Sequence, residues 1–345
     1  MAVIKDVAKK AGLSVSAVSK YLNSPDTVRE DTRVRIEAAI KELNYVPSIA
    51  ARSMRTKRSK MVAVLVPDIQ DEFYAKIFSY MNEYVLAKGY TPILYTTEHD
   101  DVLLPSYLRK MSIASFEGIV PCFIDEDKFL NECIQINQDV PVVMLSGIKE
   151  DVHACAVTDL HLGSYIATKH LIDQGYQKIA FVGSLKSSKS NIAKFDGYVK
   201  ALQEAKMTVH EDFQIYGKSR YKEGYLAAKQ LLHLEVSPDA VVTANDAVAA
   251  GFIKYAVSHG FRVPEDVGVM GFDNVPIAAI YEPGISTIEL SLREMCCAAV
   301  DLLIEIIKGN TGVPMSVNFV PKLIARKTTD RRHILSNSGQ DLFTE

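Results

Sequence analysis

Cysteine is scarce in this sequence, which excludes a fold held together by disulfide bonds. Five cysteines are scattered over 345 residues, their number is odd, and none forms a C-x-x-C pair. Buried, reduced thiols are therefore the expected state of these side chains.

Long apolar runs are also absent. No stretch of about 18 apolar residues occurs, so the sequence contains no transmembrane helix. The first residues lack the apolar core of a signal peptide, and we expect a cytoplasmic protein. This expectation argues against a secreted solute-binding protein.

The sequence lacks the common catalytic and metal-binding patterns. It contains no G-x-S-x-G, no P-loop and no H-E-x-x-H, and its eight histidines do not cluster with cysteine or aspartate at ligand spacing. We therefore predict no catalytic residues, no metal and no cofactor. Two carboxylates such as Asp71 and Asp273 would suit an enzyme cleft, but sugar binding explains them as well.

The charge is divided unevenly along the chain. Residues 1–60 contain 13 Lys and Arg against 6 Asp and Glu, whereas the remaining residues contain 26 against 36. A basic head on an acidic body indicates that nucleic acid binds the head.

Residues 4–23 have the pattern of a helix-turn-helix. Apolar residues at i, i+3, i+4 and i+7 from Ile4 make one helical stripe, and Gly12 can adopt the positive φ that ends a helix. Ser14 can cap a second helix, in which Val18 and Leu22 point inward. The outward residues of that short polar helix then suit the DNA major groove; they are Val15, Ser16, Ser19 and Lys20.

A third helix and a basic linker follow. The helix is predicted from about Glu30 to Leu43 and ends before Pro47. Residues 48–60 contain five basic side chains and little apolar content. Alone this segment is expected to be a tether, whereas on DNA it can order as a short helix, with Met54 wedged between base pairs.

From Met61 onward, strands and helices alternate, which predicts a doubly wound α/β body. Met61–Val66 is a continuous apolar run, typical of a strand buried on both faces. Further strands are predicted at 91–95, 118–120, 141–145, 178–182, 213–216, 240–243, 267–271, 317–320 and 322–324. Helices are predicted at 73–88, 102–114, 129–137, 160–174, 192–204, 221–232, 246–259 and 292–308. Two such halves place a ligand cleft at the carboxyl ends of their strands.

Together these features resemble the lactose–galactose repressor family of bacterial transcription regulators. The resemblance reaches to about Thr328, and the body resembles periplasmic sugar-binding proteins. Its most specific motifs are Ile4-Lys5-Asp6-Val7-Ala8, Ser14–Asn23, Arg52-Ser53-Met54, Val66-Pro67-Asp68, Thr243-Ala244-Asn245-Asp246 and Gly271-Phe272-Asp273. The predicted domains are a DNA-binding head (1–47), a hinge (48–60), a body for effector binding and dimerisation with two interleaved α/β subdomains (61–330), and a tail (331–345).

The resemblance implies which residues bind DNA. Val15, Ser16 and Lys20 match positions that read bases, and Met54 stands where the family has an intercalating Leu. Lys20 replaces a usual Arg and Ala17 a usual Thr, so the operator preference is expected to differ from the family norm. The full implied set is Ser14, Val15, Ser16, Ala17, Ser19, Lys20, Asn23, Tyr45, Arg52, Ser53, Met54 and Arg55.

The resemblance also implies an effector site. Asn245 and Asp273 match positions that bond sugar hydroxyls, and Lys194 replaces a ligand-gripping Arg. Asn245 and Asp246 would serve equally as a helix cap, and Phe73 or Tyr74 as helix core. The full implied set is Asp68, Asp71, Phe73, Tyr74, Ser188, Ser190, Lys194, Asn245 and Asp273.

The implied function is a homodimeric regulator, and repression is the usual family outcome. A small molecule, expected to be a sugar or sugar derivative, would control its affinity for a pseudo-palindromic double-stranded DNA operator. One alternative is a catabolite regulator with a phosphoprotein corepressor, although Asp301 stands where such proteins carry Arg. The other is a sugar-binding protein without DNA function, which the basic head opposes.

Overall fold

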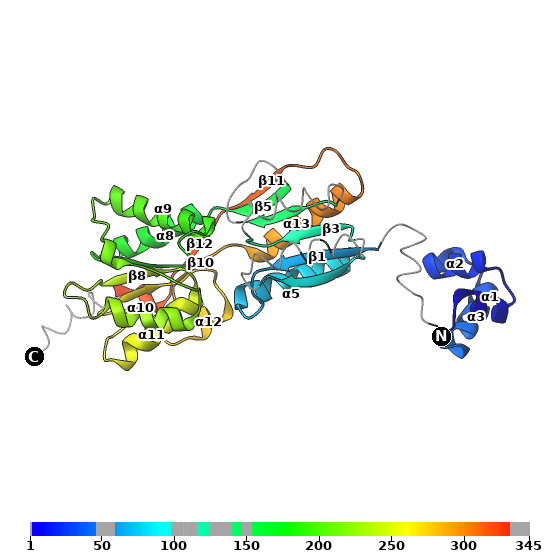
Figure 1. Cartoon of the computed structure of the whole chain (residues 1–345), viewed down its shortest axis with the longest axis horizontal. Coiled ribbons are helices and arrows are strands. Elements are labelled where there is room, and N and C mark those ends of the chain that lie inside the picture. Colours follow the sequence, from blue (N-terminus) through cyan, green and yellow to red (C-terminus); the bar gives the residue numbers. More distant parts are fainter. Residues whose placement is uncertain are drawn as a thin grey trace, which may run out of the picture. The chain divides into compact units, whose positions relative to one another are not determined.

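The structure, a computed structural model, describes residues 2–45, 59–97, 106, 109, 116–124, 140–146 and 154–331. The chain divides into two compact units, Met1–Lys60 and Met61–Glu345. The first unit is the headpiece and the second is the body (Figure 1).

The headpiece is a three-helix unit with its own core. Its helices are α1 (Ile4–Ala11), α2 (Val15–Asn23) and α3 (Glu30–Glu42), with the short 3₁₀ helix η1 (Pro25–Thr27) between the last two. The predicted inward residue Val18 is fully buried, and α3 contributes Ile36 and Ala39 to the same core. The apolar stripes predicted for the three helices therefore meet.

The turn between α1 and α2 is formed as the sequence predicts. Gly12 has φ 64°, and the side chain of Ser14 accepts a hydrogen bond from the backbone N–H of Ala17 at 3.2 Å. In addition, Arg35 of α3 donates to the carbonyl of Ala11 at 2.6 Å. This bond ties the third helix to the turn and holds α2 in place.

The body contains two lobes, each built on a parallel sheet. In lobe 1, strands run in the order β2-β1-β3 and β11-β5-β4, and two isolated bridges join β3 to β4. Its strands are β1 (Met61–Val66), β2 (Thr91–Thr96), β3 (Gly118–Pro121), β4 (Val143–Ser146), β5 (Ala154–Thr158) and β11 (Ser316–Phe319). Helices α5 (Glu72–Ala87) and α13 (Leu292–Ile307) pack together against this sheet.

Lobe 2 has the sheet order β7-β6-β8-β9. These strands are β6 (Ile179–Gly183), β7 (Gln214–Tyr216), β8 (Ala240–Thr243) and β9 (Gly268–Met270). Figure 1 shows α8 (Leu160–Asp173) and α9 (Lys189–Glu204) on one side of the sheet, and α10 (Tyr221–Leu231) and α11 (Asp246–Ser258) on the other. The lobe also contains α12 (Pro276–Ile280), the 3₁₀ helices η2 (Glu211–Phe213) and η3 (Lys327–Thr329), and the antiparallel pair β10 (Thr287–Glu289) and β12 (Lys322–Ile324).

Over the described residues, the chain passes between the lobes three times: after β5, after β10 and after β11. The lobes are therefore interleaved in sequence. The crossings place the carboxyl ends of β1, β8 and β9 where residues of both lobes meet.

Several sequence predictions fall outside the described residues. These are the helix at 129–137, nearly all of the helix at 102–114, most of the hinge, and the tail beyond Arg331. Among the residues that are described, no helix is both long and apolar enough to cross a membrane.

Candidate functional site

The outer face of α2 is the candidate DNA-reading surface. Val15, Ser16 and Lys20 are exposed, and Ala17 is half-buried, as a face turned toward DNA requires. Ser19 was predicted to point outward. This prediction is wrong, because Ser19 is only 7% exposed. Ser19 follows the fully buried Val18 and lies on the same inner side of α2.

The other predicted DNA residues have different surroundings. Ser14 caps α2, and its Oγ lies 2.8 Å from the Oγ of Ser16. Asn23 is the last residue of α2, and Tyr45 packs half-buried against the headpiece core. Four of the predicted residues lie outside the described part of the chain: Arg52, Ser53, Met54 and Arg55.

In the body, polar residues that follow the strands of both lobes come together. Asp71 follows β1, and Asn245 follows β8 in the other lobe. The side-chain amide of Asn245 donates to the carboxylate of Asp71 at 3.4 Å and to the carbonyl of Ser219 at 3.1 Å. Asn245 also caps α11 by accepting from the backbone N–H of Val248 at 2.9 Å. Asn245 therefore caps α11 and at the same time links the two lobes, and its contact with a ligand stays a prediction.

Arg220 joins the two lobes beside Asp68, and the sequence analysis missed it. Its guanidinium forms an ion pair with the carboxylate of Asp68 and donates to the side chain of Gln70 at 3.1 Å. Asp68 and Gln70 belong to lobe 1, whereas Arg220 directly precedes α10 of lobe 2. Since 152 positions separate Arg220 from Asp68, no local pattern could have paired them.

Lys194 lies at the centre of the acidic cluster. Its ammonium group donates to the carbonyl of Ala244 at 2.8 Å and lies 3.8 Å from the ring centre of Phe272. Burial lowers the pKa of Lys194, while the nearby carboxylates, Asp273 foremost, act in the opposite direction. A lysine in this position supplies a compact charge rather than a planar fork.

Asp246 holds the loop that presents Asp273. It is fully buried, and its carboxylate accepts from the backbone N–H of Val275 at 2.9 Å and from the hydroxyl of Thr287 at 2.6 Å. Within that loop the backbone φ is 98° at Asp273 and 50° at Asn274. Positive φ angles are uncommon for residues other than glycine. Asp246 therefore stabilises the loop that positions Asp273.

The remaining predicted effector residues differ in their access to the cleft. Phe73 is a core residue, 6% exposed, whose ring packs edge-on against Phe123. Tyr74 is half-buried beside Asp71 and Asp273, and burial raises the pKa of its phenol. Ser188 precedes α9 and Ser190 lies in its first turn; no contact of either with the cleft cluster is found among the described residues.

Burial dominates the electrostatics of this cluster. It raises the pKa of Asp246 to about 8 and that of Asp273 to about 7, and it also raises the pKa of Asp71. Removing several carboxylates from water costs free energy, which a bound hydrogen-bond donor would offset. The cleft is therefore chemically suited to a ligand rich in hydroxyl or amino groups.

These pKa values predict how stability depends on pH. A carboxyl whose pKa is raised above its ordinary 3.8 stabilises the folded chain fully below pH 3.8. That contribution is lost progressively as pH rises from about 4 to the folded-state pKa, about 7 for Asp273 and about 8 for Asp246. Thermal unfolding followed by circular dichroism should therefore show a midpoint that falls from about pH 5 to pH 8 and then levels off, with at most about 1.4 kcal/mol per pH unit per group.

Asp246→Asn is expected to flatten this dependence. The amide can accept from Val275 and donate to Thr287, so the loop stays anchored while the titrating group is removed. A midpoint that rises from pH 6 to 8.5 in the unmodified chain would contradict the raised pKa values.

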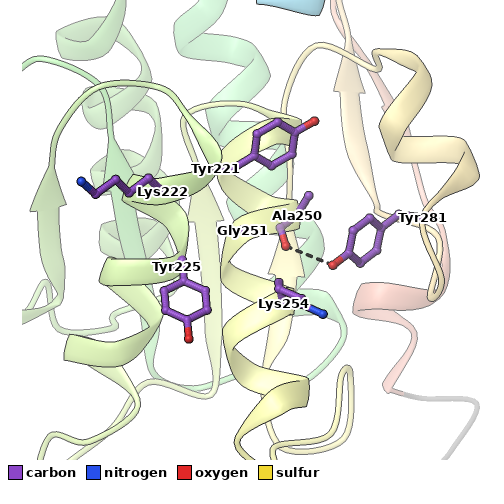
Figure 2. A pocket seen from close by; sticks show the side chains of 7 residues that line it. All are labelled: Tyr221, Lys222, Tyr225, Ala250, Gly251, Lys254 and Tyr281. Carbon is purple, nitrogen blue, oxygen red and sulfur yellow. Dashed lines mark hydrogen bonds between the residues drawn. The ribbon is translucent and has the colours of Figure 1, made fainter.

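A separate groove lies on the outer side of lobe 2. Figure 2 shows the residues that line it on α10 and α11, together with Tyr281, whose hydroxyl donates to the carbonyl of Ala250 at 3.2 Å. The groove encloses about 430 Å³. A Cβ on Gly224 would collide with the carbonyl of Val248, and one on Gly251 with that of Tyr221, so glycine permits the close packing of α10 on α11.

Comparisons with known proteins agree with this arrangement. The description "Bacterial regulatory proteins, lacI family" matches residues 3–48, and "Periplasmic binding protein-like domain" matches residues 168–329. The chain is 32% identical over 329 residues to the HTH-type transcriptional repressor PurR of Photobacterium profundum, covering 95% of this chain and 98% of that protein. The HTH-type transcriptional repressor PurR of Vibrio atlanticus is 31% identical over 329 residues, again covering 95% of this chain and 98% of that protein.

Solved structures show the same fold. A transcriptional regulator CelR–cellobiose complex is 27% identical, with a TM-score of 0.70 over 95% of this chain and 100% of that one. The lac repressor dimer bound to operator and the anti-inducer ONPF is 23% identical, with a TM-score of 0.86 over 95% and 99%. Headpiece and two-lobe body thus occur together in both solved structures.

Proposed function

This chain belongs to the LacI family of bacterial regulatory proteins, and we propose that it is a transcriptional repressor controlled by a carbohydrate or sugar derivative bound between its lobes. At the coarser level it is a DNA-binding transcriptional regulator. The observation that carries the finer proposal is the group of polar side chains from both lobes at the carboxyl ends of β1, β8 and β9.

The headpiece supports specific operator binding. Lys20 is exposed on α2 beside Val15 and Ser16, and α2 is fixed by the Ser14 cap and the Arg35 bond. A lysine in the major groove donates to guanine, but without the bidentate geometry of arginine.

Replacing Lys20 with alanine should weaken specific operator binding by roughly 1–3 kcal/mol, about 5- to 150-fold, because a base contact is lost. The operator is first selected from random-sequence DNA with the full chain, and affinity is then measured by fluorescence anisotropy at fixed salt. Lys41→Ala, an exposed lysine near the end of α3, is the matched control. Equal losses in both variants would remove Lys20 from base recognition.

The cleft chemistry supports a polyhydroxyl effector. Carboxylates accept hydrogen bonds from sugar hydroxyls, and the half-buried ring of Tyr74 adds an apolar surface. The similarity to a cellobiose-bound regulator points the same way. A thermal-shift screen of neutral sugars and sugar phosphates tests the class, because a ligand of the folded state raises the unfolding midpoint.

Three contacts between the lobes provide a route for control. They are the Arg220–Asp68 ion pair, the Asn245–Asp71 hydrogen bond, and a hydrogen bond from Lys76 to the carbonyl of Asn274 at 3.1 Å. A ligand that inserts among these side chains shifts the balance between open and closed lobes, provided it binds the two states differently. The shift in lobe 1 then reaches the hinge and the headpiece.

A second copy of this chain is the proposed partner, since a pseudo-palindromic operator requires two headpieces. The outer face of lobe 2 offers an apolar surface for it on the adjoining helices α10, α11 and α12. Exposed side chains there are Tyr221 at 48%, Leu226 at 50%, Val257 at 55% and Ile280 at 77%. Soluble proteins rarely leave such a group uncovered.

Ile280→Asp should therefore shift the chain from dimer to monomer, because a carboxylate would be desolvated at the centre of the contact. Sedimentation velocity measures the outcome, with Ile192→Asp on α9, another exposed isoleucine (47%), as control. An unchanged dimer in Ile280→Asp would place the interface elsewhere.

The phosphoprotein-dependent alternative finds no support at Asp301. Its carboxylate pairs with Lys88 at 2.6 Å and accepts from the hydroxyl of Tyr84 at 3.0 Å. Side-chain hydrogen bonding to Asp301 raises the pKa of Lys88, so the two groups are joined as an ion pair. A negative group at this position disfavours a phosphorylated partner.

A further inference from the structure

Asp273, the carboxylate proposed to bind the effector, lies in a turn with an uncommon backbone. The φ angles are 98° at Asp273 and 50° at Asn274. Residues other than glycine keep such angles only where surrounding groups hold them. Asp246 gives part of this support through the backbone N–H of Val275, and the backbone N–H of Asp273 donates to the carbonyl of Ile288 at 2.8 Å.

The rest of the support reaches the turn through Asn274, which makes four hydrogen bonds. Its side-chain carbonyl accepts from the guanidinium of Arg326 at 2.8 Å, and its side-chain amide donates to the carboxylate of Glu289 at 3.3 Å. Its backbone N–H donates to the hydroxyl of Thr287 at 3.3 Å, and its backbone carbonyl accepts from the ammonium group of Lys76 at 3.1 Å. The bond to Arg326 is the shortest of the four and has a charged donor, so we expect it to be the strongest.

Arg326 is itself held firmly between β12 and η3. A second N–H of its guanidinium donates to the carbonyl of Ile285 at 2.7 Å, and its backbone N–H donates to the hydroxyl of Ser286 at 2.8 Å. Its stem passes close to Gly284, where an added Cβ would lie 3.3 Å from the Cδ of Arg326. A planar guanidinium can donate to two separate oxygens in fixed directions, which a lysine ammonium group does less well. Arg326 is therefore a fixed support for Asn274.

We propose that Arg326 is a positioning residue of the effector site: it fixes Asn274 and thereby the direction of the Asp273 carboxylate. Arg326 acts through Asn274 and needs no contact with the effector. The proposal rests on the effector role of Asp273 proposed above. A carboxylate that is already oriented loses less freedom when a ligand binds, which improves affinity.

Hydrogen–deuterium exchange of the full-length chain without sugar measures the turn directly, because the backbone N–H groups of residues 273–275 are all bonded. Arg326→Gln is expected to raise their exchange rate about tenfold or more, and that of β6 less than about twofold. Lys327→Gln, whose exposed lysine pairs with Glu282 at 3.0 Å, is the matched control and should exchange as the unmodified chain does. Unchanged exchange in the turn, or an equal rise throughout lobe 2, overturns the proposal.

Asn274→Gly tests whether Arg326 acts through Asn274. Glycine suits φ 50° and keeps the backbone bonds while the side chain is removed. This variant is expected to raise exchange in the turn as Arg326→Gln does, and the double variant no further, because both changes break the same link. Additive effects, or unchanged exchange in Asn274→Gly, overturn the proposal. The second criterion decides even if Arg326→Gln does not fold.

Sugar affinity gives the functional measurement, with the sugar that the thermal-shift screen identifies as the probe. Arg326→Gln and Asn274→Gly are each expected to bind it about five- to tenfold more weakly. At saturating sugar their operator response should be complete, because Asp273 is retained. Affinity equal to that of the unmodified chain in both variants overturns the positioning role. If no sugar binds the unmodified chain, the carbohydrate proposal fails, and the exchange rates still decide whether Arg326 holds the turn.

Discussion

A chain that lacks residues 1–60 is expected to lose specific operator binding altogether and to retain effector binding. The headpiece and the body are separate compact units, and the headpiece buries its own apolar core around Val18 and Ile36. The remaining body is acidic, because it contains 26 Lys and Arg against 36 Asp and Glu. Without a basic surface to neutralise phosphates, affinity should fall at least about 1000-fold.

Electrophoretic mobility shift and calorimetry on the same preparation measure the two activities. Circular dichroism of the truncated chain serves as the control for folding. If operator and effector binding disappear together while the chain stays folded, the division into a DNA-binding head and a ligand-binding body is wrong.

Asp273→Gly is expected to abolish the effector response without lowering stability. The carboxylate is the one we assign to the ligand, and losing a charged hydrogen bond costs roughly 1.5–3 kcal/mol of affinity, about 10- to 150-fold. At the same time φ 98° suits glycine, and the substitution removes a buried carboxylate whose pKa burial raises to about 7. The unfolding midpoint at pH 8 should therefore stay constant or rise.

The sugar identified by the thermal-shift screen is the probe, and its effect on operator affinity is the measurement. Asn274→Gly is the matched control, since it changes the neighbouring left-handed residue (φ 50°) and keeps Asp273. A normal sugar response in Asp273→Gly would exclude this residue from the effector site, and a marked loss of stability would show that its carboxylate supports the fold.

Most secondary structure was predictable because it depends on neighbours in sequence. Ser14, Gly12 and the apolar spacing of α1 determine the helix-turn-helix, and the apolar run at Met61 determines β1. Weaker patterns were missed. β5 (Ala154–Thr158), α12 (Pro276–Ile280) and β10 (Thr287–Glu289) are short, and β5 and β10 each pair with a strand far along the chain, β11 and β12.

The candidate site was only partly predictable. Asp68, Asp71, Asn245 and Asp273 were predicted because they directly follow strands or match family motifs, and parallel strands bring such residues to one edge. Arg220 follows no such rule, and the burial of Ser19 depends on how α2 lies on the headpiece core.

The sequence by itself determined that a basic helix-turn-helix precedes an α/β body and which residues leave its strands at the ligand edge. Those features depend on periodicity, capping and charge within short segments. Only the tertiary structure decided which charges meet. Asp68 pairs with Arg220 because three chain crossings interleave the lobes, and Asp246 anchors the Asp273 loop. Such contacts follow from the path of the whole chain, which no local pattern encodes.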